Sequence, residues 1–198
     1  MNGIFRLKRV ALAAVLAVAV AAPAGATTLK RMGLEDLVKT HGKIVVGEVV
    51  DVRSYWNHDG NFILTDVRFF VEQVVKGRLQ EKSEITVTLL GGEVGDLSTL
   101  IIGGADLVKG NSYVLFLNEQ NLPGADNALT VREHVQGAFD VKLDKGGLRA
   151  ISQAVRHPLL PDADKLVDPP GGREGLPLNT MIQSMRAISA RESRREVK

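Results

Sequence analysis

The chain has 198 residues, 25 basic and 23 acidic residues, an apolar fraction of 44% and no cysteine. This length fits one domain with tails. The lack of cysteine excludes disulfides, a thiol nucleophile, thiolate metal ligands and a lipid-bearing cysteine. The nearly balanced charge provides no basic field for nucleic acid, so we expect no nucleic-acid partner.

The first 26 residues have the three-part layout of a secretory signal peptide. Three basic residues precede an apolar run over residues 10–22, which is shorter than the ~20 residues that cross a bilayer. The small residues Ala24 and Ala26 favour cleavage before Thr27. Because the chain also lacks cysteine, we expect a bacterial periplasmic or secreted protein with no membrane association after cleavage. An uncut N-terminal anchor is the alternative.

Apolar spacing predicts one short helix before the strands begin. Leu34, Leu37 and Val38 lie at i, i+3 and i+4, and acidic residues occupy the first turn. We therefore expect a helix over residues 34–41, stopped by Gly42.

Two long strands joined by a tight turn form the strongest β signal. They cover residues 43–55 and 62–75, with Asp-Gly in the turn between them. In the second strand, apolar and charged residues alternate, which is typical of a half-buried strand. Gly47 lies inside the first strand and predicts a bulge. A third strand is expected over residues 85–89.

A glycine-rich connection over residues 91–111 separates these strands from the rest. Connections of this length are usually functional or carry structure of their own. The next strand, residues 112–117, is apolar on both faces and therefore central. The pattern then predicts a polar loop, two strands and a short edge strand, over residues 118–127, 128–135, 138–143 and 148–151.

Composition changes after His157. A proline- and glycine-rich linker is expected over residues 157–178, followed by an amphipathic helix and charged tail over residues 179–198. Thr180 is the expected N-cap. One face carries the apolar side chains Met181, Ile182, Met185 and Ile188. We expect this face to pack on the strand domain; docking onto another protein is the alternative.

The strand count predicts a mainly β fold. Residues 27–156 are expected to form a small, partly open antiparallel OB-like β-barrel, with the short helix before its first strand and the second helix after the linker. A two-sheet sandwich is the alternative.

Several segments, in this order, resemble the netrin-module and tissue-inhibitor-of-metalloproteinase type of OB-fold found in bacterial secreted proteins. They are the short helix, Ile44 to Val50, the strand before Lys76-Gly77, the Gly91 to Gly95 turn and Gly110 to Leu117. The resemblance covers about residues 34–143. Those inhibitors chelate the target's zinc through an N-terminal cysteine, which this chain lacks, so their inhibitory residues are not carried over.

No catalytic or metal-binding motif stands out. The four histidines, His41, His58, His134 and His157, form no H-x-x-x-H pair, and a surface role is expected for them, with a metal site assembled in three dimensions as the alternative. Asp162 and Asp164 resemble the start of a calcium loop but lack its later ligands, so we interpret them as solvated linker residues. The Gly91 to Gly95 run lacks the lysine of a phosphate loop, so its glycines are interpreted as turn residues. No cofactor and no metal are expected.

Two segments are candidates for partner binding. The first is Tyr55, Trp56 and His58 near the hairpin tip, where aromatic residues often form interface hot spots. Trp56 is alternatively a core plug at the barrel end. The second is the apolar patch Leu97, Leu100, Ile101 and Ile102, which is either a covering flap or an exposed surface.

These observations favour an exported, non-catalytic binding module that engages a protein or another envelope component. An inhibitor or accessory protein of a secreted peptidase is the first alternative. An enzyme with a spatially assembled site is the second.

Overall fold

The structure is a computed structural model that describes residues 31–132, 134–156 and 171–196. The predicted signal peptide and its cleavage site (Ala24, Ala26 and Thr27), the Asp162 and Asp164 pair, and His157 lie outside the described residues. Among the described residues, no helix is long and apolar enough to cross a membrane.

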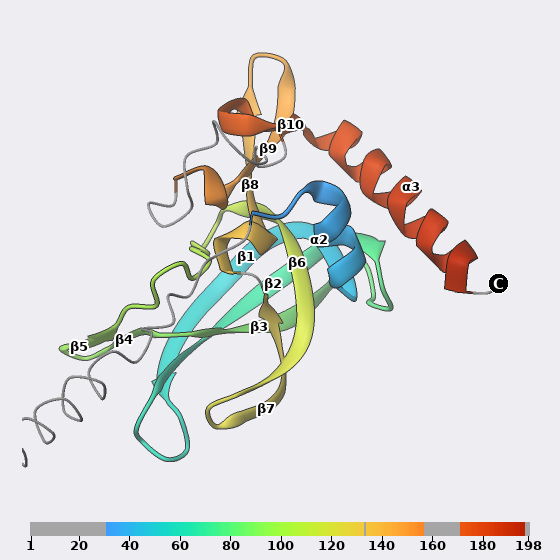
Figure 1. Cartoon of the computed structure of the whole chain (residues 1–198). Helices are drawn as coiled ribbons and strands as arrows, with labels where there is room; N and C mark the ends of the chain where they lie inside the picture. The colour runs from blue at the N-terminus through green and yellow to red at the C-terminus, as the bar shows by residue number, and fades with distance from the viewer. Residues whose placement is uncertain (1–30, 133, 157–170, 197–198) are drawn as a thin grey trace, which may run out of the picture.

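The described chain is mainly antiparallel β structure with two α-helices (Figure 1). The helices are α2 (Leu34–Thr40) and α3 (Leu178–Glu196). The strands are β1 (Lys43–Trp56), β2 (Ile63–Lys76), β3 (Ser83–Leu90), β4 (Gly92–Val94), β5 (Leu97–Thr99), β6 (Ser112–Leu122), β7 (Ala125–Val131), β8 (Ala138–Asp144), β9 (Gly147–Ser152) and β10 (Leu176–Pro177). Short 3₁₀ turns are η1 (His134–Gly137), η2 (Gln153–Arg156) and η3 (Gly172–Glu174).

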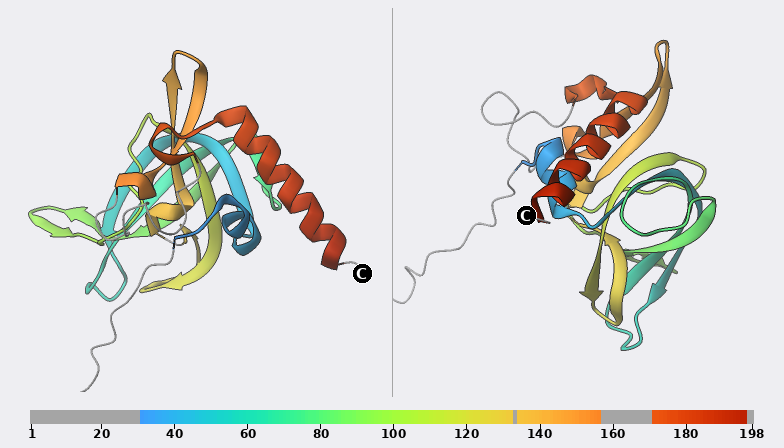
Figure 2. Two further views of the ribbon diagram at one scale, coloured as in Figure 1. Left: turned by 45° about the horizontal axis from the view of Figure 1, so that its top comes forward. Right: turned by 90° about the vertical axis from the view of Figure 1, so that its right-hand side faces the viewer.

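The main sheet has the order β10-β9-β8-β6-β1-β2-β3, and β7 also pairs with β6. It curls until β3 lies against β7, but no ladder joins these two strands within the described residues. The result is a partly open, OB-like barrel, seen almost end-on in the right view of Figure 2. This confirms the predicted fold class. β4 and β5 form a separate small hairpin.

The barrel interior is filled by the inward-facing residues of the long strands. On β2, Val67, Phe69 and Val71 are fully buried, whereas Arg68 and Glu72 on the other face are exposed. The predicted alternation is therefore confirmed. It fixes the register, because a slip by one residue would move the charged set into the interior.

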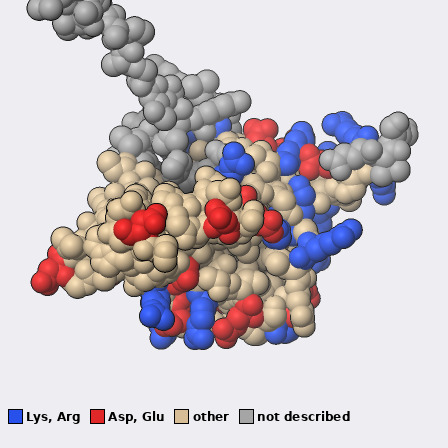
Figure 3. Space-filling model, turned by 90° about the horizontal axis from the view of Figure 1, so that it is seen from below, with Lys and Arg blue, Asp and Glu red and all other residues tan. Residues whose placement is uncertain are grey.

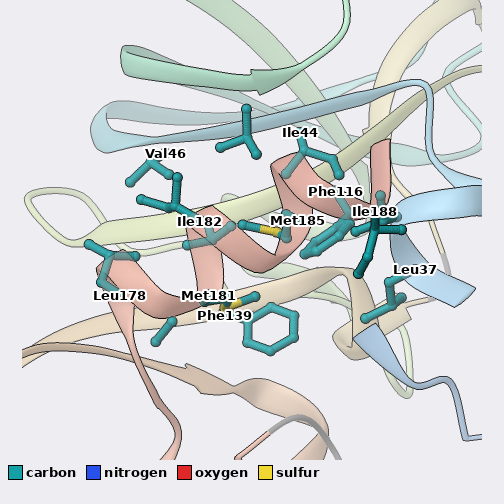
Figure 4. Close-up of a cluster of buried hydrophobic side chains, with 14 residues drawn as sticks. Leu37, Ile44, Val46, Phe116, Phe139, Leu178, Met181, Ile182, Met185 and Ile188 are labelled. Carbon is teal, nitrogen blue, oxygen red and sulfur yellow. The ribbon is translucent and has the colours of Figure 1, made fainter. Parts of the chain in front are cut away.

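β6 is central, as predicted, because both of its faces are covered. Tyr113, Leu115 and Leu117 enter the barrel interior, while Val114 and Phe116 belong to a second apolar layer on the outer face. Helices α2 and α3 cover that second layer, in which Phe116, Phe139, Met181 and Met185 are fully or almost fully buried (Figure 4). The predicted apolar face of α3 thus packs on the barrel.

Gly47 confirms the predicted irregularity in the first strand. The β1–β2 register shifts at Gly47, and an added Cβ there would lie 2.0 Å from the Phe70 carbonyl oxygen. Only glycine allows the two backbones to approach this closely.

Several predicted boundaries are wrong. α2 ends at Thr40 with His41 extended as its C-cap, and Gly42 instead donates its N–H to Asn118 Oδ1 at 2.7 Å. α3 begins at Leu178, so Thr180 lies within its first turn and is not the N-cap. Long strands also replace the expected polar loop: β6 and β7 continue through residues 118–131 and turn only at residues 123–124.

Two further differences concern the end of the domain. β7 stops at Val131, and the η1 turn replaces the end of the expected strand. β9 is not an edge, because Leu176 and Pro177 pair with it as β10. Arg149 on β9 supports this pairing by donating hydrogen bonds to the carbonyl oxygens of Glu174 and Gly175 at 2.7 and 2.8 Å.

Candidate functional site

The most prominent surface feature is the β4–β5 hairpin with the residues that follow it, residues 92–102, which we call the flap. Its base is fixed to the β1–β2 hairpin. The Gly91 N–H donates to the Ile63 carbonyl at 2.9 Å, and Thr65 Oγ1 donates to the Gly91 carbonyl at 2.6 Å. Ser54 Oγ is 2.8 Å from Thr65 Oγ1 and completes the chain of hydrogen bonds. The flap therefore projects from a rigid support.

Glycine is required where the flap leaves the barrel. Gly91 and Gly92 have φ of +83° and +133°, a region that favours glycine. A Cβ on Gly92 would lie 2.2 Å from Thr65 Oγ1 and 2.4 Å from Ser54 Oγ. These glycines are turn residues, as predicted, and they allow the flap to touch the strands directly.

The flap exposes large apolar side chains. Leu97, Leu100 and Ile102 are 59%, 85% and 67% exposed, while Ile101 is half-buried and faces Gly91. No lysine or arginine occurs between residues 83 and 108. The projection at the left of Figure 3, which the flap forms, is accordingly mostly uncharged, with acidic side chains at its end. Leu97, Leu100 and Ile102 thus form an exposed surface, whereas Ile101 packs at the flap base.

A groove of about 310 Å³ lies beside the flap, at the seam between β3 and β7. Its walls are mainly apolar, with Gln120 and Arg132 at the polar side. They include Leu89, Leu90, Ile101, Ala105, Leu122 and Val131. Ile101 is therefore shared between the flap and the open seam of the barrel.

The aromatic pair lies on the neighbouring part of β1. Trp56, the last residue of β1, is 40% exposed, so it does not close the barrel end as a buried plug. Along the strand it faces the same side as Ser54, against which the flap base lies. Tyr55 faces the other side, where its hydroxyl donates to Asp66 Oδ1 at 3.2 Å. Burial, then the Asp66 charge and hydrogen bond, raise the pKa of Tyr55.

The hairpin tip is held by Asn57, which sequence reasoning missed. Its buried amide accepts hydrogen bonds from the N–H groups of Asn61 and Phe62 at 3.0 and 3.1 Å, and it donates to the Pro123 carbonyl at 3.4 Å. The tip is therefore clamped to the β6–β7 turn. His58, next along, is exposed. An asparagine that opens a turn was the available signal, because such residues hydrogen-bond nearby backbone N–H groups.

The far end of the glycine-rich connection is tied to β1. Lys109 Nζ lies 3.2 Å from Asp51 Oδ1, and the N–H of Gly110 donates to the Val49 carbonyl at 2.8 Å. The hydrogen bond and charge of Lys109, with a smaller contribution from Arg68, lower the pKa of Asp51. Both ends of the connection are thus anchored, and the exposed apolar residues lie between them.

The histidines do not form a site in the described structure. His41 corrects the surface expectation, because it is fully buried, donates from Nδ1 to the Leu37 carbonyl at 2.7 Å and lies edge-on to Phe116. The side chain of His134 lies outside the described part. Among the described residues, no group of three or more histidine, cysteine or acidic side chains could hold a metal ion.

The structure brings part of the predicted site together. Trp56 and the flap base occupy one side of β1, and Ile101 joins the flap to the seam groove. Tyr55 faces the opposite side, and His58 lies at the clamped tip. Neither a family model nor a curated protein sequence matches the chain.

Proposed function

We propose that the chain is a non-catalytic binding module that engages a protein partner through the flap and the adjoining seam groove. The observation that carries this proposal is the set of three large apolar side chains, Leu97, Leu100 and Ile102, exposed along the flap. Single exposed apolar residues are ordinary on a protein surface, but a contiguous group marks an interaction site.

The anchoring of the flap supports the proposal. Its base has the Gly91 and Thr65 hydrogen bonds and the close Gly92 contact, so little order has to be gained there on binding. A pre-organised element loses less conformational entropy when it docks, and more of the burial energy is kept as affinity. Burying each of the three side chains contributes about 1.5–3 kcal/mol before these costs.

The expected setting is the bacterial periplasm or the extracellular space, after cleavage before Thr27. N-terminal sequencing of the protein purified from the native cell tests this part. A mature N-terminus at Thr27 supports export by the signal peptide route, and recovery of the unprocessed chain in the cytosol contradicts it.

Photocrosslinking tests the binding surface. A crosslinking amino acid replaces Leu100, and in a matched control it replaces Leu143, which is 80% exposed at the β8–β9 hairpin far from the flap. We expect a discrete crosslinked protein from the native cell envelope at Leu100 only, and its loss when Ile102→Ser is added. Equal crosslinking at both positions, or none at Leu100, contradicts the proposal.

A peptidase assay separates the first alternative from a general binding role. Secreted metallopeptidases are incubated with the processed protein and with its Leu100→Ser variant. Inhibition that the variant loses would identify a peptidase as the partner of the flap. Inhibition that both proteins share would place the contact elsewhere and would contradict the flap assignment.

A further inference from the structure

A second concave site lies away from the flap, where β8 diverges from the barrel. It is a pocket of about 480 Å³ between the end of the glycine-rich connection, the start of β6, β8 and the η2 turn. Its size falls in the range of small-molecule sites, about 300–1,000 Å³. Val108, Val135 and the buried Tyr113 supply the apolar lining, whereas the side chain of Val141 lies on the other face of β8 and packs in the layer under the helices.

Tertiary hydrogen bonds fix the shape of this pocket. The Asp106 N–H donates to Gln153 Oε1 at 2.9 Å. Gln153 Nε2 in turn donates to the Asp106 carbonyl at 2.7 Å and to Asp140 Oδ1 at 2.9 Å. On the other side, the Val108 N–H donates to the Tyr113 hydroxyl oxygen at 2.9 Å. These bonds hold the connection against β6 and β8, so the walls are in place before a ligand arrives.

One pair of charges in the pocket is held near contact without a hydrogen bond. Lys142 Nζ and Asp140 Oδ2 are 3.9 Å apart, which exceeds hydrogen-bond distance. The Asp140 side chain is only 18% exposed, whereas that of Lys142 is 52% exposed. A ligand group that both accepts from the ammonium and donates to the carboxylate completes this pair.

The other polar groups of the pocket also call for a ligand that both donates and accepts hydrogen bonds. The carboxylate of Asp106 and the amide oxygen of Asn111 accept, and the Tyr113 hydroxyl, which accepts from the Val108 N–H, still has a hydrogen to donate. Two aspartates and one lysine leave the walls with one net negative charge. This charge disfavours phosphate and carboxylate ligands, and the lysine disfavours a small cation. A neutral ligand with several hydroxyl groups satisfies donors and acceptors together, and its C–H surface matches the valines.

We propose that this pocket binds a saccharide unit, with one ring hydroxyl bridging Lys142 and Asp140. The site is independent of the flap, because it shares no lining residue with the flap or with the seam groove.

Nuclear magnetic resonance titration of the processed, isotope-labelled protein tests this assignment. The probes are the methyl glycosides of glucose, galactose, mannose and N-acetylglucosamine, with ethylamine and acetate as charged probes. At least one glycoside is expected to give saturable amide shifts confined to residues 106–113, 135, 140–142 and 153. No shift with any glycoside at millimolar concentration overturns the proposal. Saturation there by ethylamine or acetate alone overturns it too, and identifies an ion site.

Matched variants locate the contact. Lys142→Met removes the charged donor and should weaken glycoside binding by about tenfold or more, the typical loss for a hydrogen bond to a charged group. Lys145→Met, in the exposed β8–β9 turn, removes the same charge outside the pocket and should leave the affinity unchanged. Equal effects of the two substitutions contradict the assignment. Leu100→Ser should also retain glycoside binding, so that failure of the flap proposal and failure of this one are distinguishable.

Discussion

The packing of α3 against the barrel gives the sharpest prediction of stability. Met185 is fully buried in the layer that also holds Ile44, Phe116 and Phe139 (Figure 4). Met185→Ala removes three heavy atoms from this layer and leaves a cavity. Replacing a buried methionine by alanine typically costs about 2–5 kcal/mol. We expect about 3 kcal/mol, because a surface helix can shift slightly to fill part of the space.

Urea unfolding measures this change directly. For a domain of this size, 1 kcal/mol shifts Tm by about 2–4 °C, so the variant should melt about 6–12 °C lower. Gln183→Ala is the matched control on the same helix, since its side chain is exposed and its loss should change stability by less than about 0.5 kcal/mol. The urea dependence should keep its slope, because the exposed surface of the unfolded state does not change.

Equal stability of the Met185→Ala and Gln183→Ala variants would refute the reasoning. The apolar face of α3 would then not be part of the folded core. It would be free to dock onto another protein, which is the alternative that the sequence pattern left open.

Three further predictions test local features. Gly47→Ala should destabilise the fold by about 3 kcal/mol or more, because the added Cβ would clash with the Phe70 carbonyl and the backbone would have to move. Urea unfolding measures this loss. A loss of stability below about 1 kcal/mol would contradict the close contact. The Tyr55 hydroxyl should ionise above the ordinary tyrosine pKa of 10.0. Tyrosinate absorbance, compared with that of the Tyr55→Phe variant, measures the midpoint of this ionisation. Asp66→Asn should bring the midpoint back toward the ordinary value. Because the folded pKa is raised, this tyrosine's contribution to stability is complete below pH 10.0 and is lost as pH rises through the folded pKa. A Tyr55 midpoint at or below the ordinary value would contradict the burial. Gly92→Val should displace the flap and abolish the Leu100 crosslink, while circular dichroism should show that the chain stays folded. An unchanged crosslink would show that the flap base is not needed for binding.

Alternating patterns predicted the strands that form the barrel. In β2 the inward-facing Val67, Phe69 and Val71 leave one register possible, so sequence and structure agree. β6 was identified as central because an apolar strand has to be buried on both faces, and β1 and β8 flank it in the sheet.

The missed features depend on contacts between distant residues. β4 and β5 have three residues each, too few to show a period, and the close approach of Gly92 to β1 and β2 joins residues far apart in the chain. The polar residues after Leu117 suggested a loop, but they continue β6 beyond its buried part, and the side chains of residues 119–121 are exposed there. In the sequence, His41 has the position of a surface residue at a helix end. Its burial depends on Phe116 of β6, which is far away in the chain, so the local pattern could not predict it.

The two proposed sites were not equally accessible to sequence reasoning. Leu97, Leu100 and Ile101 lie close together in the chain, and an apolar run inside a glycine-rich connection is visible without a structure. The pocket is assembled from separate segments, and the hydrogen bonds that fix its shape join Gln153 to Asp140 and to the Asp106 backbone. No spacing rule brings these residues together.

The two apolar layers hold the fold together without the exposed side chains of the flap. β1 and β6 contribute to the barrel interior and to the layer under the helices, so these two strands connect most of the buried apolar surface. The exposed side chains of the flap belong to neither layer. Their replacement by polar residues should therefore change stability by less than about 0.5 kcal/mol, as is usual for surface positions. It follows that a loss of binding in Leu100→Ser or Ile102→Ser reports on the surface itself and not on unfolding.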